Sequence, residues 1–282
     1  MSAAPNAPHV AIIGLGAIGG SVALALRSRG VEPSVFTSST IDASLAANDS
    51  FAVRESLEAA VADADLVLLA TPLDAMATLA TSVVGAAPNA TVLHAGSLLR
   101  AEALGFTPEI AARVIGTHPM AGSHLSGFPA ARADMFHGAV IYVERRGTPR
   151  QRADAELLWG LAGAGRLELV DAMQHDDAMG WLSHGPQLVA TTLAYALASA
   201  KRDGEGLAGG PGVRDVTRLA ASDFAIWRPI LERSPEAASE VLMGVSNALE
   251  QVRHALETKD WESMERMWKI ASDWRRSLEP RA

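Results

Sequence analysis

The residue best suited to chemistry is His118, which follows the apolar pair Val114-Ile115 in the stretch Gly116-Thr117-His118-Pro119. An imidazole titrates near neutral pH, so a histidine on a loop after a strand can accept and return a proton. Histidines that only form structural hydrogen bonds are more common than catalytic ones. We expect His118 to be a proton acceptor of near-neutral pKa, with activity that rises through its titration; a structural histidine is the alternative.

A glycine-rich turn is the second chemical feature. Gly14-x-Gly16-x-x-Gly19 lies between an apolar run at residues 9–13 and a helix-like segment at residues 22–29. Between a strand and a helix, this spacing allows a tight turn and brings backbone amides close to a pyrophosphate. It predicts a dinucleotide site formed by Gly14, Gly16, Ala17, Ile18 and Gly19, with a turn that binds no ligand as the alternative.

The end of the second expected strand bears on the choice of cofactor. Sites for NAD commonly have an acid about 20 residues after the glycines, which binds the ribose 2′-hydroxyl. Here the chain reads Thr37-Ser38-Ser39-Thr40, with neither a carboxylate nor an adjacent arginine. Small hydroxyl side chains tolerate a 2′-phosphate, so Ser38 and Ser39 favour NADP, or use of both NADP and NAD. Alternatively, Ser39 or Thr40 caps the next helix, which is compatible with either cofactor.

Thr71 and Pro72 follow the apolar run at residues 66–69. Ligands of open α/β sheets bind at the carboxyl ends of the strands, so these two residues are expected to lie along the cofactor. An ordinary helix start with proline in its first turn is the alternative.

The elements that must position these residues change in type along the chain. Short apolar runs at residues 9–13, 35–36, 66–69, 91–93, 114–115 and 139–143 alternate with helix-length segments such as 73–84. This alternation is typical of an α/β domain with a Rossmann-type, doubly wound, mostly parallel sheet. From about residue 150 helical periodicity dominates, with a long segment at 171–200, a kink predicted at 182–186 by Pro186, and closing helices at 235–257 and 259–278. We predict a dinucleotide-binding domain at residues 1–148 and an all-helical domain at residues 149–282.

Composition excludes several classes of protein. The chain has 282 residues, 24 Lys+Arg against 32 Asp+Glu and a net charge of −8, so it has no basic excess for nucleic acid or an anionic membrane. It has no cysteine, which excludes thiolate nucleophiles, disulfides and cysteine-ligated metals, and we expect no metal site. The first residues lack a basic start followed by an apolar run, and no stretch of about 18 uncharged apolar residues occurs. A soluble, cytoplasmic protein of about two domains is expected.

Further motifs follow one another along the chain: Gly96-Ser97, Gly116–Ser123, His175-Asp176, Ser183-His184-x-Pro186, Gly209-Gly210-Pro-Gly212-Val-Arg214-Asp215-Val-Thr217-Arg218, Ser222-Asp223 and Trp227. With the glycine turn, this series resembles the prephenate/arogenate (cyclohexadienyl) dehydrogenase family of tyrosine biosynthesis over nearly the whole chain. The resemblance implies oxidative decarboxylation of arogenate to tyrosine, or of prephenate to 4-hydroxyphenylpyruvate, with hydride transfer to NADP or NAD. It also implies a homodimer formed through the helical domain.

The resemblance assigns roles to individual residues. His118 would accept the proton of the ring hydroxyl as hydride leaves, and Ser97 would brace that hydroxyl or the histidine. His184 would line the substrate pocket, and Arg218 would bind a substrate carboxylate, to which a guanidinium is well matched. Ser123 and Thr217 complete the substrate-binding set. The alternatives are a turn serine, a core histidine and a solvated surface arginine.

Some positions depart from the family pattern. His124 and Leu125 stand where family members often have an acid and a base, and Gln187 replaces a common second histidine. His94 begins a segment that usually starts with an aspartate. These changes leave the choice between prephenate and arogenate open.

Two other functions fit parts of the sequence. A β-hydroxyacid or imine-type reductase shares the glycine turn and a helical domain, but it predicts a lysine or aspartate in a catalytic role in the long helix, and residues 171–200 contain no lysine. It also gives His118 no role. A non-catalytic NADP-sensing module would keep the glycine turn without explaining Ser97, His118, His184 and Arg218.

Overall fold

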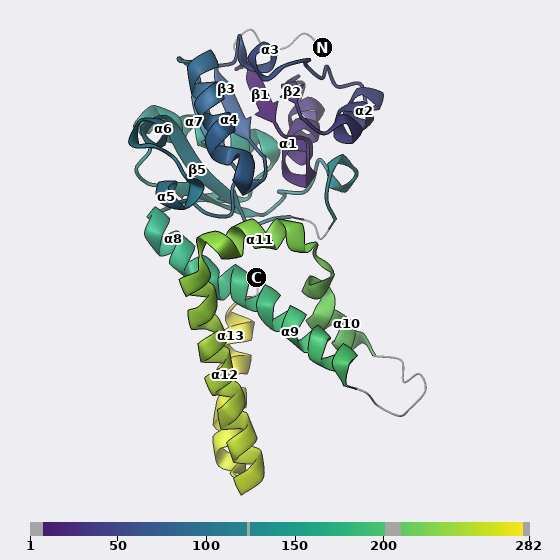
Figure 1. Ribbon diagram of the computed structural model, residues 1–282, viewed down its shortest axis with the longest axis vertical. Helices are drawn as coiled ribbons and strands as arrows, with labels where there is room; N and C mark the ends of the chain where they lie inside the picture. The colour runs from purple at the N-terminus through teal and green to yellow at the C-terminus, as the bar shows by residue number, and fades with distance from the viewer. Residues whose placement is uncertain (1–7, 123–124, 201–209, 279–282) are drawn as a thin grey trace.

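The computed structural model describes residues 8–122, 125–200 and 210–278, which form a sheet domain and a helical domain (Figure 1). The sheet has seven strands in the order β2-β1-β3-β4-β5-β6-β7. They are β1 (Val10–Ile13), β2 (Ser34–Phe36), β3 (Leu66–Leu69), β4 (Thr91–His94), β5 (Val114–Pro119), β6 (Val140–Glu144) and β7 (Arg166–Val170). Strands β1 to β5 are parallel, β6 is antiparallel to β5, and β7 is parallel to β6. The predicted Rossmann-type, mostly parallel sheet is confirmed.

The strand order creates a switch point between β1 and β3. From β1 the chain moves to β2 on one side, then crosses to β3 on the other side of β1. Where connections diverge in this way, a crevice forms outside the carboxyl ends of the two strands, and ligands bind there. The turn after β1 holds the three glycines and the turn after β3 holds Thr71 and Pro72, so both motifs flank the switch point.

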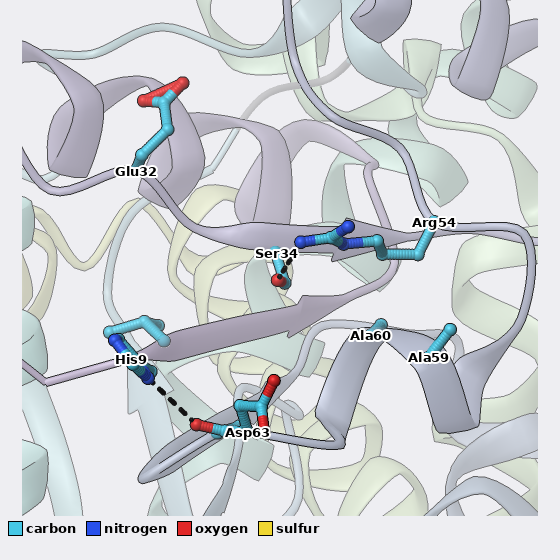
Figure 2. A pocket seen from close by; sticks show the side chains of 9 residues that line it. His9, Glu32, Ser34, Arg54, Ala59, Ala60 and Asp63 are labelled. Atoms are coloured by element: carbon cyan, nitrogen blue, oxygen red, sulfur yellow. Dashed lines mark hydrogen bonds between the residues drawn. The ribbon is translucent and has the colours of Figure 1, made fainter.

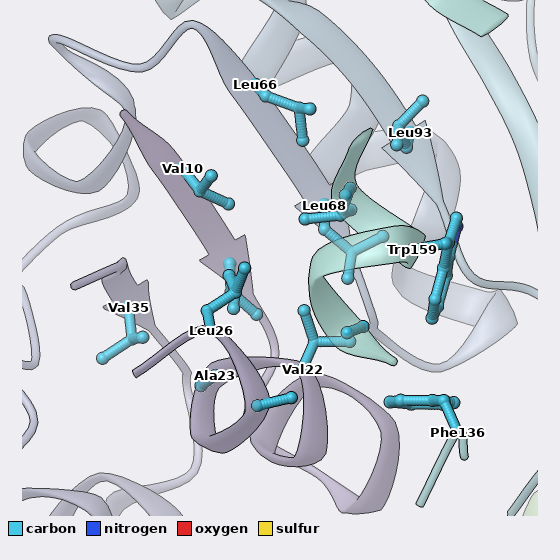
Figure 3. Close-up of a cluster of buried hydrophobic side chains, with 14 of the residues drawn as sticks. Val10, Val22, Ala23, Leu26, Val35, Leu66, Leu68, Leu93, Phe136 and Trp159 are labelled. Carbon is cyan, nitrogen blue, oxygen red and sulfur yellow. The ribbon is translucent and has the colours of Figure 1, made fainter. Parts of the chain in front are cut away.

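Both faces of the sheet are covered by helices: α1 (Ala17–Ser28), α2 (Thr40–Asn48), α3 (Leu57–Val61), α4 (Leu73–Ala86), α5 (Ala101–Leu104), α6 (Pro108–Arg113) and α7 (Pro149–Ala162). Alternate strand residues point to opposite faces, so the core is divided in two. On one face Val22 and Leu26 of α1 and Trp159 of α7 pack over Leu68 and Leu93 (Figure 3). On the other face the core is built from α3, α4, α5 and α6. Every residue of β1, β3 and β4 is buried, which explains why these strands were recognisable as apolar runs.

The sheet continues beyond residue 148, where the domain boundary was expected. Helix α7 packs against β4 and β6, and β7 pairs with β6 along its whole length. Strand β7 reads Arg-Leu-Glu-Leu-Val and none of its residues is fully buried, because it lies at the edge of the sheet. An edge strand needs no continuous apolar run, so the sequence carried little signal for it.

The helical domain begins with a long helix. It is α-helical at α8 (Ala172–Met179), π-helical at Gly180–His184 and α-helical again at α9 (Gly185–Ser199). The kink predicted at residues 182–186 is thus a π-helical turn that starts at Gly180. There follow α10 (Pro211–Thr217), a 3-10 turn (Arg218–Ala221), α11 (Phe224–Arg233), α12 (Pro235–Thr258) and α13 (Trp261–Ser277), and the two closing helices match their prediction.

Figure 1 shows α8 and α11 next to the sheet domain, with α12 and α13 extending away from it. Helix α11 joins the two domains: Ile230 is buried in the core of the sheet domain, and Arg233 forms an ion pair with Asp74 of α4 at 2.9 Å. Among the described residues, no helix is both long enough and apolar enough to cross a membrane.

Candidate active site

The glycine turn has the geometry that a dinucleotide site requires. Gly14 has φ +99°, and a Cβ there would lie 2.4 Å from the Ala70 carbonyl oxygen. A Cβ at Gly19 would lie 1.9 Å from the Gly14 oxygen, so Gly19 lets α1 approach the turn. At Gly16 a Cβ would meet no atom within 4 Å, and Gly16 is the N-cap of α1 without a side-chain cap. The start of α1 thus has no side-chain cap and open space beside Gly16, which fits a pyrophosphate.

Neighbouring residues lie where the sequence placed them. Thr71 is next to Gly14, since its Cγ2 lies 2.9 Å from the position of a Gly14 Cβ, and Pro72 is the N-cap of α4. Ala17 and Ile18 form the first turn of α1. Their contacts with a cofactor stay predictions.

The serines after β2 divide between two roles. Ser39 caps α2, because its Oγ accepts a hydrogen bond from the Asp42 amide at 3.2 Å, so the capping alternative is confirmed. Ser38 is exposed at the carboxyl end of β2. Arg54 hydrogen-bonds Ser34 at the other end of β2, at 3.4 Å. A contact between these serines and a 2′-phosphate stays a prediction.

A hollow of about 240 Å³ lies at the amino ends of the strands, on the side of the sheet away from the glycine turn (Figure 2). Its lining includes His9, Glu32, Arg54 and Asp63, and it opens at the amino ends of β1 and β2. Two of its polar side chains are hydrogen-bonded within the protein: His9 Nδ1 lies 3.1 Å from the Asp63 carbonyl oxygen, and Arg54 lies 3.4 Å from the Ser34 hydroxyl. Because ligands of such sheets bind at the carboxyl ends, this hollow is not the candidate site.

His118 lies at the carboxyl end of β5 and begins a chain of hydrogen bonds. Its Nδ1 is 2.9 Å from Nε2 of His175, and Nδ1 of His175 is 2.8 Å from Oδ1 of Asp176. The His175 ring also forms edge-to-face contacts with the rings of His118 and Tyr142, at 5.1 and 5.4 Å. Tyr142 is the β6 residue paired with His118 in the sheet. The His118 ring is thus held in one orientation.

Asp176 is the anchor of this chain. Its carboxylate is buried and accepts hydrogen bonds from the Leu99 amide at 2.8 Å and the Arg100 amide at 3.0 Å, and the Arg100 guanidinium lies 3.2 Å away. Burial alone would raise the pKa of Asp176, but the bonds from His175 and the two amides outweigh it and hold the pKa below its usual value. Asp176 is therefore ionised at neutral pH.

The expected near-neutral pKa of His118 is wrong. Burial, reinforced by the nearby His175, lowers the pKa of His118 to about 3. Burial disfavours the charged imidazolium, which a sequence pattern cannot reveal. At neutral pH His118 is neutral and has a free lone pair, so it can accept a proton.

His184 lies at the end of the π-helical turn and is 1% exposed. Within the described residues, neither of its ring nitrogens has a hydrogen-bond partner. Its ring faces Trp227 of α11 edge-on at 6.2 Å. Gly185 allows α12 to approach, since a Cβ there would lie 2.6 Å from Val241. A core histidine is normally hydrogen-bonded, so these two unpartnered nitrogens fit a position that receives a polar group.

The remaining predicted residues are less closely assembled. Ser97 follows β4 next to the loop that Asp176 holds, but its side chain hydrogen-bonds no described residue. Thr217 donates its hydroxyl to the Val213 carbonyl at 2.6 Å, within α10. Arg218 is exposed, and no hydrogen bond or ion pair in the described part of the chain links it to His118 or His184. Ser123 and His124 lie outside the described residues.

Two of the departures now have a structural place. His94 is buried, and its Nδ1 accepts a hydrogen bond from the Gly96 amide at 3.1 Å; burial, with Arg146 nearby, lowers its pKa to about 3. Gln187 donates to the Leu219 carbonyl at 2.9 Å and so ties the 3-10 turn that starts at Arg218 to α9.

The hydrogen bonds from Asp176 through His175 to His118 were not predicted from the sequence. His175-Asp176 was noted there only as one motif of the family resemblance. The signal was an adjacent acid–base pair in a helix.

A Rossmann-type sheet, a glycine turn shaped for a pyrophosphate and a histidine chain at the same edge define the class: nucleotide-dependent oxidoreductases with a helical second domain. Comparison with known proteins agrees. The model of the prephenate dehydrogenase nucleotide-binding domain matches residues 22–162, and that of the prephenate dehydrogenase dimerization domain matches residues 171–270. The chain therefore belongs to the prephenate dehydrogenase family, as its motifs suggested.

Individual relatives cover most of the chain. A prephenate dehydrogenase of Lactococcus lactis is 27% identical over 96% of this chain and 77% of its own length. A cyclohexadienyl dehydrogenase of Zymomonas mobilis is 29% identical over 89% of each chain. The crystal structure of prephenate dehydrogenase from A. aeolicus with hydroxyphenyl propionate and NAD+ superposes with a TM-score of 0.85, covering 97% of this chain and 99% of that one at 23% identity. At this identity the superposition shows a shared fold.

Proposed function

We propose that this chain catalyses the oxidative decarboxylation of a cyclohexadienyl acid, arogenate or prephenate, with NADP favoured over NAD as the hydride acceptor. One observation carries the proposal: a neutral His118, backed by His175 and Asp176, lies at the sheet edge that also holds the glycine turn. The names of the relatives give the substrate class. The lack of a carboxylate at residues 37–40, directly after β2, supports NADP.

The chemistry needs a proton acceptor and accurate positioning. The dinucleotide, when bound at the glycine turn, supplies the acceptor for the hydride that leaves the hydroxyl-bearing ring carbon. His118 accepts the hydroxyl proton as that carbon becomes a ketone. The ring carboxylate then leaves as carbon dioxide because the ring becomes aromatic, and the phenolate oxygen takes the proton back from His118. His118 ends the reaction in the neutral form in which it began, so the step balances without another base.

The other residues complete the proposed site. His184 offers two free ring nitrogens to a polar group of the substrate. Ser97 braces the hydroxyl or His118, and Arg218 binds a carboxylate after the helical domain is completed by a partner subunit. Ser123 and Thr217 stay in the proposed substrate set on the resemblance alone.

We extend the proposal to a homodimer formed through the helical domain. The three tryptophans of α13, Trp261, Trp268 and Trp274, are each more than half exposed, and Tyr195 of α9 is 73% exposed. Large apolar groups gathered on one domain are typical of a surface that a partner covers. Sedimentation equilibrium should give about twice the chain mass of 29.5 kDa. A monomer at micromolar concentration would contradict the dimer without affecting the reaction.

The reaction is tested with purified protein given prephenate or arogenate, each with NADP or NAD, while the absorbance of reduced nicotinamide is followed. We expect turnover in at least one combination, and His118→Asn should lower kcat by ~10²–10⁴ because the proton acceptor is lost. A wild-type kcat in His118→Asn at every pH would reject the role of His118. A kcat/KM about tenfold higher with NAD would reject the NADP preference.

The same assay separates the rival functions. No turnover with any of the four pairs of substrate and cofactor, together with binding of NADP, would favour the sensing module. Turnover of imines or β-hydroxyacids alone would favour the reductase. The histidine chain has no purpose in either of these proteins, which is why we prefer the dehydrogenase.

A further inference from the structure

We propose that Asp176 and His175 are positioning residues that fix the tautomer of His118, so that its Nε2 is the proton-accepting atom. Nothing in the glycine turn or in β5 itself would set this tautomer. The consequence for turnover rests on the proposed function. The tautomer is a property of the ligand-free protein and can be tested without substrate.

The hydrogen bonds determine the tautomer step by step. An ionised carboxylate only accepts, so Nδ1 of His175, 2.8 Å from Asp176 Oδ1, must carry a hydrogen. When His175 is the neutral imidazole it has one N–H, on Nδ1, so its Nε2 is an acceptor. Nδ1 of His118, 2.9 Å from that Nε2, must then donate. This leaves Nε2 of His118 with the free lone pair.

The opposite order would disable the base. If Nε2 of His175 carried the hydrogen, Nδ1 of His118 would accept and Nε2 of His118 would be protonated. Such a neutral imidazole could donate to a substrate hydroxyl but could not take its proton there. The Asp176 carboxylate therefore selects the tautomer of His118 that can accept a proton on Nε2, although Asp176 does not contact His118 directly.

Asp176 also connects the two domains. It lies on α8 of the helical domain, whereas His118 and the amides of Leu99 and Arg100 belong to the sheet domain. Those amides come two and three residues after Ser97. One buried carboxylate thus holds both the loop of Ser97 and the orientation of His118, so the active site is assembled only when α8 is docked on the sheet.

The primary test is nitrogen-15 NMR of the full-length protein with labelled histidine, near neutral pH and without ligand. Comparison with His118→Asn assigns the His118 signals. We expect the ring hydrogen of His118 on Nδ1 and a bare Nε2. A His118 that carries its hydrogen on Nε2 would overturn the proposal, whatever the protein is found to turn over.

A matched pair of variants tests the route. His175→Gln keeps a carbonyl oxygen that can accept from His118 Nδ1, whereas His175→Leu removes the acceptor. We expect His175→Leu to move the His118 hydrogen towards Nε2 and to lower kcat by ~10²-fold, with KM within about threefold. His175→Gln should keep the Nδ1 hydrogen and lose no more than about tenfold in kcat. Equal losses in two folded variants, with the tautomer unchanged in both, would show a merely structural role and overturn the proposal.

Asp176→Asn tests the first link. Both oxygens of Asp176 accept from N–H groups, so an amide must place its NH₂ against a donor. We expect a loss of kcat of at least ~10²-fold and a mixed tautomer at His118. A folded Asp176→Asn with wild-type kcat would overturn the role of the carboxylate. The His175 pair decides the question if this variant does not fold.

Discussion

The glycine turn and the hydrogen-bonded chain of His118, His175 and Asp176 both lie at the carboxyl ends of the strands, but they are assembled differently. The glycine turn consists of residues 14–19, which are one short loop and the first residues of α1, and its shape depends on the backbone next to the end of β3. The chain of hydrogen bonds draws on three segments, at residues 99–100, 118 and 175–176, and the last of these belongs to the helical domain. The first is a local structure; the second exists only after the domains have docked.

This difference separates what each part can do. A turn complete within the sheet domain can hold a dinucleotide before the helical domain takes any part. In the proposed mechanism proton transfer needs α8, because His118 Nδ1 is hydrogen-bonded to His175, and His175 to Asp176, both on α8. Binding of the cofactor and competence for chemistry are thus built on different parts of the molecule.

The largest expected effect concerns the glycine turn. Gly16→Ala and Gly19→Ala add the same methyl group at two positions. At Gly19 the methyl would lie 1.9 Å from the Gly14 oxygen, so we expect a loss of roughly 3 kcal/mol or more in the free energy of unfolding. At Gly16 the methyl meets no protein atom, so the loss should not exceed about 1 kcal/mol, from a poorer N-cap.

The effect on cofactor binding should be largest in the variant that loses least stability. We expect Gly16→Ala to raise the KM for the dinucleotide by about tenfold, because the methyl enters the space next to the first amides of α1. Thermal denaturation and steady-state kinetics of the pair provide the measurement. A destabilised Gly16→Ala with an unchanged KM would mean that the open space at Gly16 is not where the pyrophosphate binds.

The same contrast explains how far the sequence could be interpreted. The strands β1, β3 and β4 are buried on both faces, so they appear as apolar runs, and the glycine spacing reports a local backbone shape. Edge strand β7 was missed because it needs no such run. His118 could be singled out by type and position, but its lowered pKa comes from burial and from His175, which lies 57 residues away in sequence. Long-range contacts of this kind leave no periodic pattern.

The smaller expected effect concerns acid stability. It separates the histidines from the glycine turn, because residues 14–19 contain no titratable side chain. His94 and His118 have pKa values lowered from 6.5 to about 3 in the folded protein, and burial also lowers the pKa of His184. Between these pH values the unfolded chain binds more protons than the folded one. Stability should therefore be fully present above pH 6.5 and fall towards pH 3, by ~1 kcal/mol per pH unit for each histidine.

His94→Asn isolates one of these groups. Its side-chain oxygen can accept the hydrogen bond of the Gly96 amide that His94 Nδ1 accepts, while the titrating ring is removed. Thermal denaturation from neutral pH down to about pH 5 should show a shallower fall in Tm for His94→Asn than for the wild type, by about one proton's contribution. A wild-type Tm that does not change over this range would contradict the lowered pKa values of these histidines. If Tm depended on pH equally in His94→Asn and in the wild type, His94 would not contribute to the loss of stability in acid. The loss would then be assigned to His118 and His184, which flank the proposed substrate site.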